Sequence, residues 1–486
     1  MTNRRDDRPV MAILVVLALL PAAVFGEGPP RSLPVSPRSL TLEEAVRIGL
    51  ENSRRLAVAR TAEESAVEEV KEARAAFFPE ISLQASYVRL DEAPYIPANS
   101  FLSLLDGFRS PFESLVRRGV LEPAALEGIA GGPRRVVVGD ENNYAAGLRL
   151  KQPLFTGFAL RGAYESAKRR SEAERWSVRR EEEGVRFEVS AAYYDLVKAR
   201  ALTEVARESR ERLAAHLRDL EVRREEGALL QVDLLRGKVE LSRAKLEESR
   251  AGNGTGLAAS RLCHLLGLPV DTPLDPAETP GTLGALPDDP AGMGAVARDR
   301  RADRAALLAA IEAARAGARV PRGRFYPNLF FVGSYDWKRP DREFEDDFYD
   351  SWNVGLALDW TLFDGGARRS RVGRASLEES RLRELLGLLD DSIAIEVKHA
   401  LLFRREAVEA LALAEEQCAA AEEFRRVVRE AFDGGAATAT DLLDAETMLT
   451  AARGERVFAR ADLHLAEARL AHAVGMHLEA DGEGLR

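Results

Sequence analysis

The chain contains the same sequence unit twice, in nearly constant register. Tyr144–Gly157 aligns with Trp352–Gly365 at a shift of 208 positions. The same shift relates six further pairs: Gly227 and Gly435, Asp233 and Asp441, Leu234 and Leu442, Arg261 and Arg469, His264 and His472, and Gly267 and Gly475. Loops accept insertions readily, whereas packed periodic helices do not. Each unit is therefore predicted to be a short strand followed by a long helical hairpin whose length is fixed by packing.

Residues 1–26 have the pattern of a secretory signal. Arg4, Arg5 and Arg8 form a basic start, and the uncharged apolar run Val10–Phe25 follows, with small residues around Gly26. The apolar run is too short for a comfortable membrane span. We therefore expect an exported chain that continues with a Pro-rich leader at residues 27–39.

Charge and residue chemistry exclude several classes of function. The formal net charge is −10, which argues against nucleic acid as a partner. Cys263 and Cys418 are the only cysteines, and we expect two unpaired thiols rather than a disulfide framework. His264 and His472 occupy equivalent positions, but no cysteine or carboxylate completes a metal-ligand set. No nucleophile–base arrangement, phosphate loop or HExxH pattern occurs, so the sequence predicts no enzyme, no cofactor and no metal site.

The first repeat is expected to span residues 40–267. Its predicted elements are a helix at 41–76, a strand at 80–90, an external loop at 91–143, a strand at 144–155, and helices at 158–226 and 232–266. Thr41 and Glu44 have the spacing of a capping box at the first helix start. A break is expected near Asn52–Ser53, and Pro79 ends the helix before the first strand.

The second repeat is expected to span residues 295–478, after a Pro-rich linker at 268–294 and before a tail at 479–486. Its predicted elements are a helix at 295–320, strands at 327–337 and 351–362, and helices at 367–433 and 440–474. The two copies differ at Gly252–Gly256, where three glycines replace an ordinary helical stretch. Each glycine costs about 1 kcal/mol against alanine in a helix, so a kink or local unwinding is predicted there.

The four predicted strands alternate between apolar and polar residues, most cleanly in the second strand of each copy. An alternating strand of about 11 residues is typical of a transmembrane β-barrel. Four strands cannot close a barrel, since about eight are needed, and an open edge in hydrocarbon leaves backbone groups without hydrogen bonds. Three chains would supply 12 strands. The amphipathic helices would then continue from the barrel as a coiled-coil tunnel through the periplasm.

The residues also carry a family resemblance. The segment that begins LTLEEAVRIGLENSRRLAVAR at Leu40, together with the strand ends Pro153–Gly157 and Thr361–Gly365, resembles the TolC-like outer membrane efflux proteins. The resemblance covers about Leu40 to Leu478. It implies a mixed α/β membrane protein, namely a homotrimer with a 12-stranded β-barrel, four strands per chain, continuous with a helical periplasmic tunnel.

The same resemblance implies a function. The duct would be the passive outer-membrane exit for drugs, toxins, metals or proteins in a tripartite efflux or type I secretion system. Its partners would be an inner-membrane pump, a periplasmic adaptor protein and outer-membrane lipid. The helix turns would form the periplasmic entrance, where the adaptor docks. The residues that match this docking tip are Gly227, Ala228, Leu229, Gly434, Gly435 and Ala436. Their alternative role is purely structural, because glycine ends a helix cheaply.

A candidate gate follows the second turn. Asp441 and Asp444 are three residues apart on one helix face, and in a trimer they would form two rings of carboxylates that favour cations. The alternative is an ordinary solvated helix start. The corresponding first-copy residues, Asp233 and Arg236, have opposite charges. This chain differs from TolC, which has a basic residue at the position of Ala437 and a hydroxylated aromatic at that of Phe432. The gate is therefore expected to depend on Phe432 packing, carboxylate repulsion or Arg236.

One rival from another class remains open at this point. A periplasmic coiled-coil scaffold without a pore would also contain long paired helices. Such a scaffold has no use for strands with a lipid-facing apolar side, so the alternating strands favour the duct.

Overall fold

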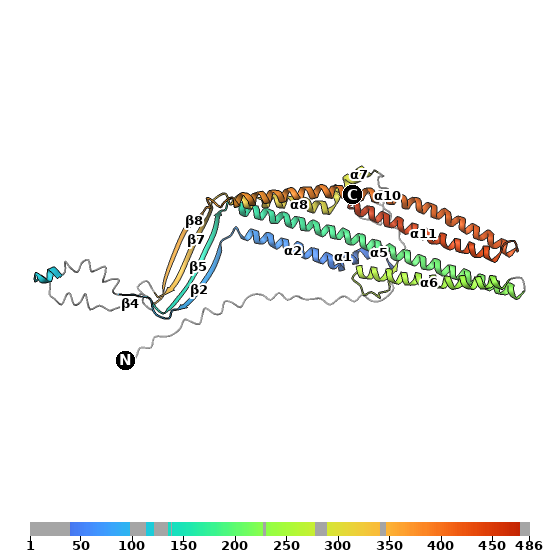
Figure 1. The fold of residues 1–486 in the computed structure, drawn as a ribbon, viewed down its shortest axis with the longest axis horizontal. Helices are drawn as coiled ribbons and strands as arrows, with labels where there is room; N and C mark the ends of the chain where they lie inside the picture. Colours follow the sequence, from blue (N-terminus) through green and yellow to red (C-terminus); the bar gives the residue numbers. More distant parts are fainter. Residues whose placement is uncertain are drawn as a thin grey trace, which may run out of the picture.

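The computed structural model describes residues 39–97, 113–120, 135–137, 139–226, 230–277, 289–340 and 347–476. The expected signal, the leader up to residue 38, the tail, and most of the 91–143 loop lie outside these ranges. The described chain is elongated, with a β-sheet at one end and two helical hairpins that run to the other (Figure 1). The sheet and the hairpin turns therefore lie at opposite ends of the described chain.

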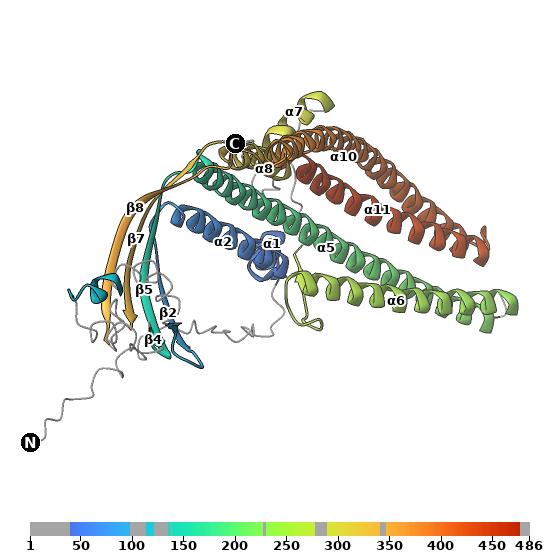
Figure 2. The same ribbon diagram turned by 60° about the vertical axis from the view of Figure 1, so that its left-hand side comes forward.

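Four strands form one antiparallel sheet in the order β2-β5-β7-β8. They are β2 (Glu80–Arg89), β5 (Asn142–Phe155), β7 (Asn328–Arg339) and β8 (Tyr349–Asp359). Figure 2 shows that the strands bend along their length. Two short ladders accompany the sheet, β3 (Tyr95–Pro97) with β4 (Arg135–Val137), and β1 (Ser39–Leu40) with β6 (Asp275–Pro276). The loop expected at 91–143 thus contains paired strands where it is described.

The last strand ends three residues before the expected boundary at 362. The backbone carbonyls of Thr361 and Leu362 accept hydrogen bonds from the Arg368 guanidinium, at 2.6 and 3.0 Å. Arg368 also contacts Asp364, at 3.1 Å. These carbonyls are therefore occupied by a side chain at the start of the next helix instead of by a neighbouring strand.

Two long hairpins make up most of the molecule. The first consists of α5 (Ala159–Glu225) and α6 (Gln231–Leu265), and the second of α10 (Ala367–Asp433) and α11 (Ala439–Val474). Both α5 and α10 contain 67 residues. Within the described ranges, no helix is both long enough and apolar enough to cross a membrane.

Shorter helices lie along the sheet-proximal half of the long ones. They are α1 (Leu42–Asn52), α2 (Arg54–Ala75), α7 (Pro290–Arg300), α8 (Ala302–Gly317) and α9 (Arg319–Gly323). Thr41 caps α1 with Glu44 as its capping-box partner, and Ser53 separates α1 from α2. In Figure 1, α1 and α2 follow α5, and α8 follows α10.

The single helix expected at 295–320 is wrong. The segment begins at Pro290 and is interrupted at Arg301 and again at Ala318. Arg301 has no helix-breaking chemistry of its own. Its guanidinium pairs with Asp303 and with Glu396 of α10. The backbone at Arg301 also lies against Gly475, where an added Cβ would meet it at 3.3 Å. Tertiary contacts therefore set this break.

The local unwinding predicted at Gly252–Gly256 does not occur, because α6 is helical throughout this stretch. The Thr255 hydroxyl is 2.9 Å from that of Thr203 on α5 and also donates to the Ala251 carbonyl. The three glycines face open space. Unwinding would forfeit the hydrogen bonds of a turn and its packing on α5, which outweighs about 1 kcal/mol per glycine.

Candidate functional site

The turn between α10 and α11 is built by its glycines. Gly435 has φ +78°, a left-handed conformation that suits glycine. Its N–H donates to the Phe432 carbonyl at 3.1 Å, and the Ala436 N–H donates to the Ala431 carbonyl at 2.7 Å. This is the Schellman arrangement that satisfies the last carbonyls of a helix. Gly434, Gly435 and Ala436 are exposed and present a surface of small side chains.

A capping box starts α11 immediately after this turn. The Asp441 carboxylate accepts hydrogen bonds from the backbone N–H and the hydroxyl of Thr438, at 2.8 and 2.7 Å. The Asp441 N–H in turn donates to the Thr438 hydroxyl at 3.2 Å. These bonds to Thr438 hold the pKa of Asp441 below its usual range. Asp441 therefore has a structural role at the helix start and remains charged and exposed.

Phe432 lies inside the chain, between the two hairpins. Its side chain is 4% exposed and packs in a cluster with Leu220, Leu234 and Leu442. The Arg223 guanidinium lies 4.5 Å from the ring centroid, over its face, and His216 meets the ring edge-on at 5.5 Å. Phe432 thus joins α10 to α5 and does not present its ring on the surface of this chain.

Ionic and polar contacts also cross between the hairpins at the turns. Arg223 on α5 pairs with Asp433 at 2.9 Å, and Arg429 on α10 pairs with Asp219 at 2.7 Å. Arg236 on α6 donates to the Thr440 hydroxyl at 3.0 Å. Each pair joins one helix of the first hairpin to one of the second. Relative movement of the hairpin ends would have to break these contacts.

A buried network farther from the turns reinforces this junction. Glu446 on α11 is 3% exposed and accepts from Arg212 on α5 at 2.8 Å and from Arg425 on α10 at 2.7 Å. Arg453 on α11 continues the network to Glu208 on α5, at 2.5 Å, and to Glu422 on α10, at 3.0 Å. The sequence reasoning missed this network. The feature of the sequence that could have revealed it is a carboxylate, Glu446, on the same face of α11 as leucines that are buried.

The structure brings only some of the expected gate residues together. Arg236 and Thr440 meet across the hairpins, and Asp441 lies in its own capping box. Asp444 is exposed and Asp233 is partly buried. Gly227, Ala228 and Leu229 lie outside the described residues. The two carboxylates expected to form rings therefore sit near the second turn of each chain, one of them already hydrogen-bonded.

Three histidines lie where the hairpins meet, of which His216 is fully buried and His464 and His472 are partly buried. His216 on α5 contacts Phe432, while His464 and His472 on α11 stack on Tyr194 and Phe187 of α5 at centroid distances of 5.0 Å. Burial is the main cause that lowers the pKa of each of these imidazoles. Among the described residues, no group of three or more potential ligand side chains could hold a metal ion.

Comparison with known proteins identifies the class. A family model for outer membrane efflux proteins matches residues 135–268 and 295–476, which together are more than half of the 486 residues. The chain belongs to the outer membrane efflux protein family. Within it, the chain is a TolC-like outer membrane factor, and its family and fold are those of channel proteins rather than enzymes.

Individual relatives are distant. The chain is 22% identical over 342 residues to the outer membrane efflux protein BepC of Brucella suis, covering 70% of this chain and 74% of BepC. It is 30% identical over 193 residues to the fusaric acid resistance protein FusA of Burkholderia cepacia, covering 38% of this chain and a third, 33%, of FusA. The crystal structure of CusC matches with a TM-score of 0.73 at 16% identity, covering 90% of this chain and 92% of CusC. That likeness establishes the fold.

Proposed function

We propose that three copies of this chain assemble into a closed duct that crosses the outer membrane and continues through the periplasm as a helical tunnel. The observation that carries the proposal is the four-stranded sheet with two open edges. In the described residues, β2 pairs only with β5, and β8 pairs only with β7. Unpaired backbone groups in hydrocarbon cost several kcal/mol each. Joining β8 of one copy to β2 of the next removes every edge, and three copies make a 12-stranded barrel.

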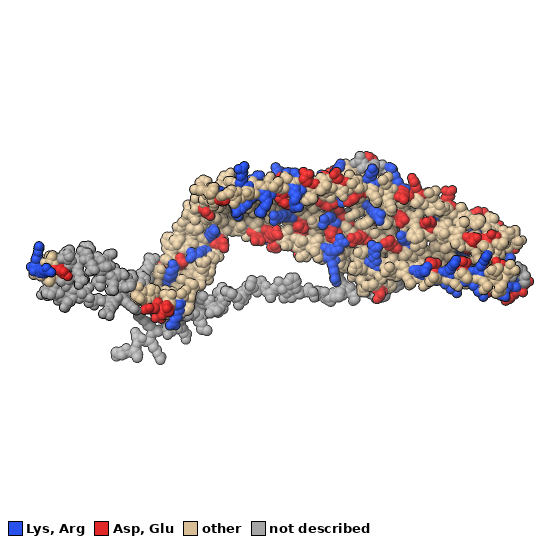
Figure 3. Space-filling view, viewed as in Figure 1, with Lys and Arg blue, Asp and Glu red and all other residues tan. Residues whose placement is uncertain are grey.

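The exposed face of the sheet supports a lipid environment. Large apolar side chains that are more than half exposed lie on its edge strands: Ile81, Leu83, Trp352, Val354, Leu356 and Leu358. Figure 3 shows a sheet with few charged side chains beside helices densely covered with them. A contiguous exposed apolar surface marks an interaction site. A scaffold in water would leave this surface unexplained.

The helices offer a second contact surface, here called the seam, to another copy of the chain. Leu443 on α11 is 6% exposed because it packs against α5, whereas Leu235, 208 positions earlier on α6, is 51% exposed. Conversely, His216 on α5 is buried, and Phe424, 208 positions later on α10, is exposed. If the repeats are equivalent, α6 of one copy covers α10 of the next as α11 covers α5 within the chain. A head-to-tail contact of this kind closes into a ring.

The hairpin turns are the proposed docking tip for a periplasmic adaptor, which would connect the duct to an inner-membrane pump. Gly434, Gly435 and Ala436 support this role because they are small and exposed at the end opposite the sheet. Gly227, Ala228 and Leu229 belong to the same proposal by their match to the family tip. Small side chains allow close approach of another helix, as at tightly packed helix interfaces.

The proposed gate lies just inside these turns. Asp441 and Asp444 would form rings of carboxylates that favour cations, with Asp233 and Arg236 alternating between them around the tunnel. The capping box fixes the Asp441 side chain, and the lowered pKa supports a charged state at neutral pH. Phe432 and the ionic contacts at the junction would hold the hairpins in the closed arrangement.

The direction of transport that we propose is export, in a tripartite efflux or type I secretion system. The names of the relatives, an efflux protein and a resistance protein, support this direction. Drugs, toxins, metals and proteins are the classes of cargo that fit such an exit duct. The duct itself would be passive, since selection and energy would come from the inner-membrane pump.

Oligomeric mass and conductance test the proposal. The purified chain in detergent should have the protein mass of three chains by light scattering, and it should resist carbonate extraction from outer membranes. In planar bilayers it should conduct ions. A stable single subunit, or release by carbonate, would contradict the duct and favour a scaffold.

A double substitution tests the gate separately. Asp441→Asn with Asp444→Asn should reduce the preference for cations over anions in single-channel recordings. Asn retains a side-chain oxygen that can still accept from Thr438, which limits damage to the capping box. Glu430→Gln with Glu455→Gln, two exposed carboxylates outside the proposed gate, is the control. Unchanged selectivity in the first variant would reject Asp441 and Asp444 as the filter while leaving the duct intact.

A further inference from the structure

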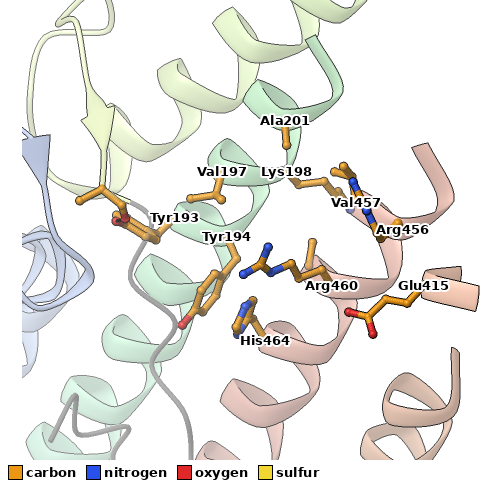
Figure 4. Close-up of a pocket in the computed structure, with 12 residues that line it drawn as sticks. Tyr193, Tyr194, Val197, Lys198, Ala201, Glu415, Arg456, Val457, Arg460 and His464 are labelled. Carbon is orange, nitrogen blue, oxygen red and sulfur yellow. Dashed lines mark hydrogen bonds between the residues drawn. The ribbon is translucent and has the colours of Figure 1, made fainter. Parts of the chain in front are cut away.

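A cavity lies where the two hairpins meet, near the middle of α5. Its volume is about 590 Å³, which is within the range of small-molecule sites, about 300–1,000 Å³. Side chains from α5, α10 and α11 line it (Figure 4), and Ala277 also contributes to the lining. It is far along the helices from the turns and from the proposed gate. The proposed transport role therefore does not account for it.

The charged side chains that line the cavity are mainly cationic. Lys198, Arg456 and Arg460 face a single carboxylate, that of Glu415. Neither Arg456 nor Arg460 has a hydrogen bond or an ion pair to any residue in the described ranges. Arg453, one turn earlier on α11, is paired with Glu208 and Glu422. Two guanidinium groups one helical turn apart are thus left available beside an open space.

One side of the cavity is aromatic. The rings of Tyr194 and His464 are stacked, with centroids 5.0 Å apart and an interplanar angle of 9°. Val197 and Ala461 add apolar surface. His464 Nδ1 is buried without a hydrogen-bond partner among the described residues. Burial, followed by the nearby Arg460, lowers the pKa of His464. The imidazole is therefore neutral at pH 7 and does not add to the positive charge.

We propose that this cavity binds a small, flat, aromatic carboxylate. The carboxylate would lie between Arg456 and Arg460, because planar guanidinium groups hold carboxylates through paired hydrogen bonds. The aromatic body would lie against the Tyr194–His464 stack, where ring contacts add to apolar burial. Glu415 disfavours a more highly charged anion. Such a ligand would contact both hairpins at once and hold them together.

Titration calorimetry on the full chain in detergent tests the site, with 2-naphthoate as the probe. The neutral isostere 2-naphthalenemethanol separates the contribution of charge, and sodium sulfate separates that of the aromatic body. We expect 2-naphthoate to bind at least ~10-fold more tightly than either, since the alcohol lacks the charge-assisted hydrogen bonds to Arg and sulfate lacks the aromatic contact. Binding to the folded state should also raise Tm with ligand concentration.

Two variants make the test specific. Arg456→Gln with Arg460→Gln should weaken 2-naphthoate binding at least ~10-fold, the loss expected when about 1.4 kcal/mol is removed. Both side chains are exposed and have no partner among the described residues, so the fold should survive, which circular dichroism checks. The control is Arg371→Gln with Arg374→Gln, two exposed arginines on α10 that do not line the cavity, which should leave binding unchanged. Absence of binding, equal loss in both variants, or equal affinity for sulfate would overturn the proposal.

Discussion

The helices α6 and α11 occupy equivalent places in their hairpins but differ in what covers them. α11 packs against both α10 and α5, whereas α6 packs mainly against α5. As a result, Leu443 and Glu446 of α11 are buried, and Leu235 and Lys238, 208 positions earlier, are exposed. The same position in a repeat can therefore be core in one copy and surface in the other. The exposed copy is informative, because its apolar residues lie where the proposed trimer would place a neighbouring chain.

The largest effect is expected at Glu446. In Glu446→Ala, Arg212 and Arg425 both lose their buried partner, and removing one side of a buried ion pair costs roughly 3–5 kcal/mol. The apparent Tm from circular dichroism should fall clearly. Lys238→Ala, at the corresponding position of α6, should lower it much less, because within the chain Lys238 makes only an exposed 3.9 Å contact with Glu221 and its removal leaves no buried charge without a partner. Equal effects of the two variants would show that the Glu446 pairs contribute no more than this exposed contact.

Leucine substitutions separate packing within a chain from packing between chains. Leu443→Ala should cost roughly 2–4 kcal/mol of folding free energy by opening a cavity against Leu213 and Ala244. Leu235→Glu should leave the helical content unchanged but reduce the trimer fraction in light scattering, because it places a charge in the proposed seam. A fully trimeric Leu235→Glu variant would remove the argument that α6 covers a neighbouring chain.

Acid should weaken the contact between the two hairpins around His216. Burial first, and then Arg429, lowers the pKa of His216, while Asp219 and Glu446 oppose this and Arg223 adds to it. The pKa of His216 is lower in the folded chain than in the unfolded chain. Its contribution to folding stability is therefore fully present above about pH 6.5 and is lost as the pH falls below that value. The loss for one group is at most about 1.4 kcal/mol per pH unit.

A matched variant isolates this contribution. Between pH 7 and pH 5, Tm should decrease less steeply in His216→Leu than in the native chain. His399→Leu is the control, since His399 lies on α10 outside the junction between the hairpins. Parallel pH profiles for the native chain and His216→Leu would show that the loss comes from other groups, including His464 and His472.

The smallest effect has the opposite sign. Gly254 lies within continuous helix and faces open space, while Asp462, 208 positions later on α11, is an ordinary helical residue. Gly254→Ala should raise stability by roughly 0.5–1 kcal/mol, chiefly by restricting the unfolded chain. Thermal unfolding measures the change. A lower Tm would indicate that this stretch needs the flexibility of glycine after all.

The elements that local signals define were predictable. The Thr41 capping box, the break at Ser53 and the turn at Gly435 each depend on residues within a few positions of one another. The alternating strands are equally local. The position of the turn at Gly434–Gly435 was predictable, but the contacts around it were not. Phe432 is buried against Leu220, and Glu446 is held by Arg212, and both contacts join residues about 210–240 positions apart.

By itself, the sequence determined where this chain is helical or extended, where its hairpins turn and which family it belongs to, because these follow from short-range propensities, caps and repeat spacing. Only the tertiary structure decided that Gly252–Gly256 stays helical, that Arg301 interrupts a helix, and that α11 is covered while α6 is open. The physical reason is that packing and ion pairs between distant helices outweigh local preferences of about 1 kcal/mol per residue. The cavity at the hairpin junction is likewise decided only by the tertiary structure, since it is formed by side chains from three helices.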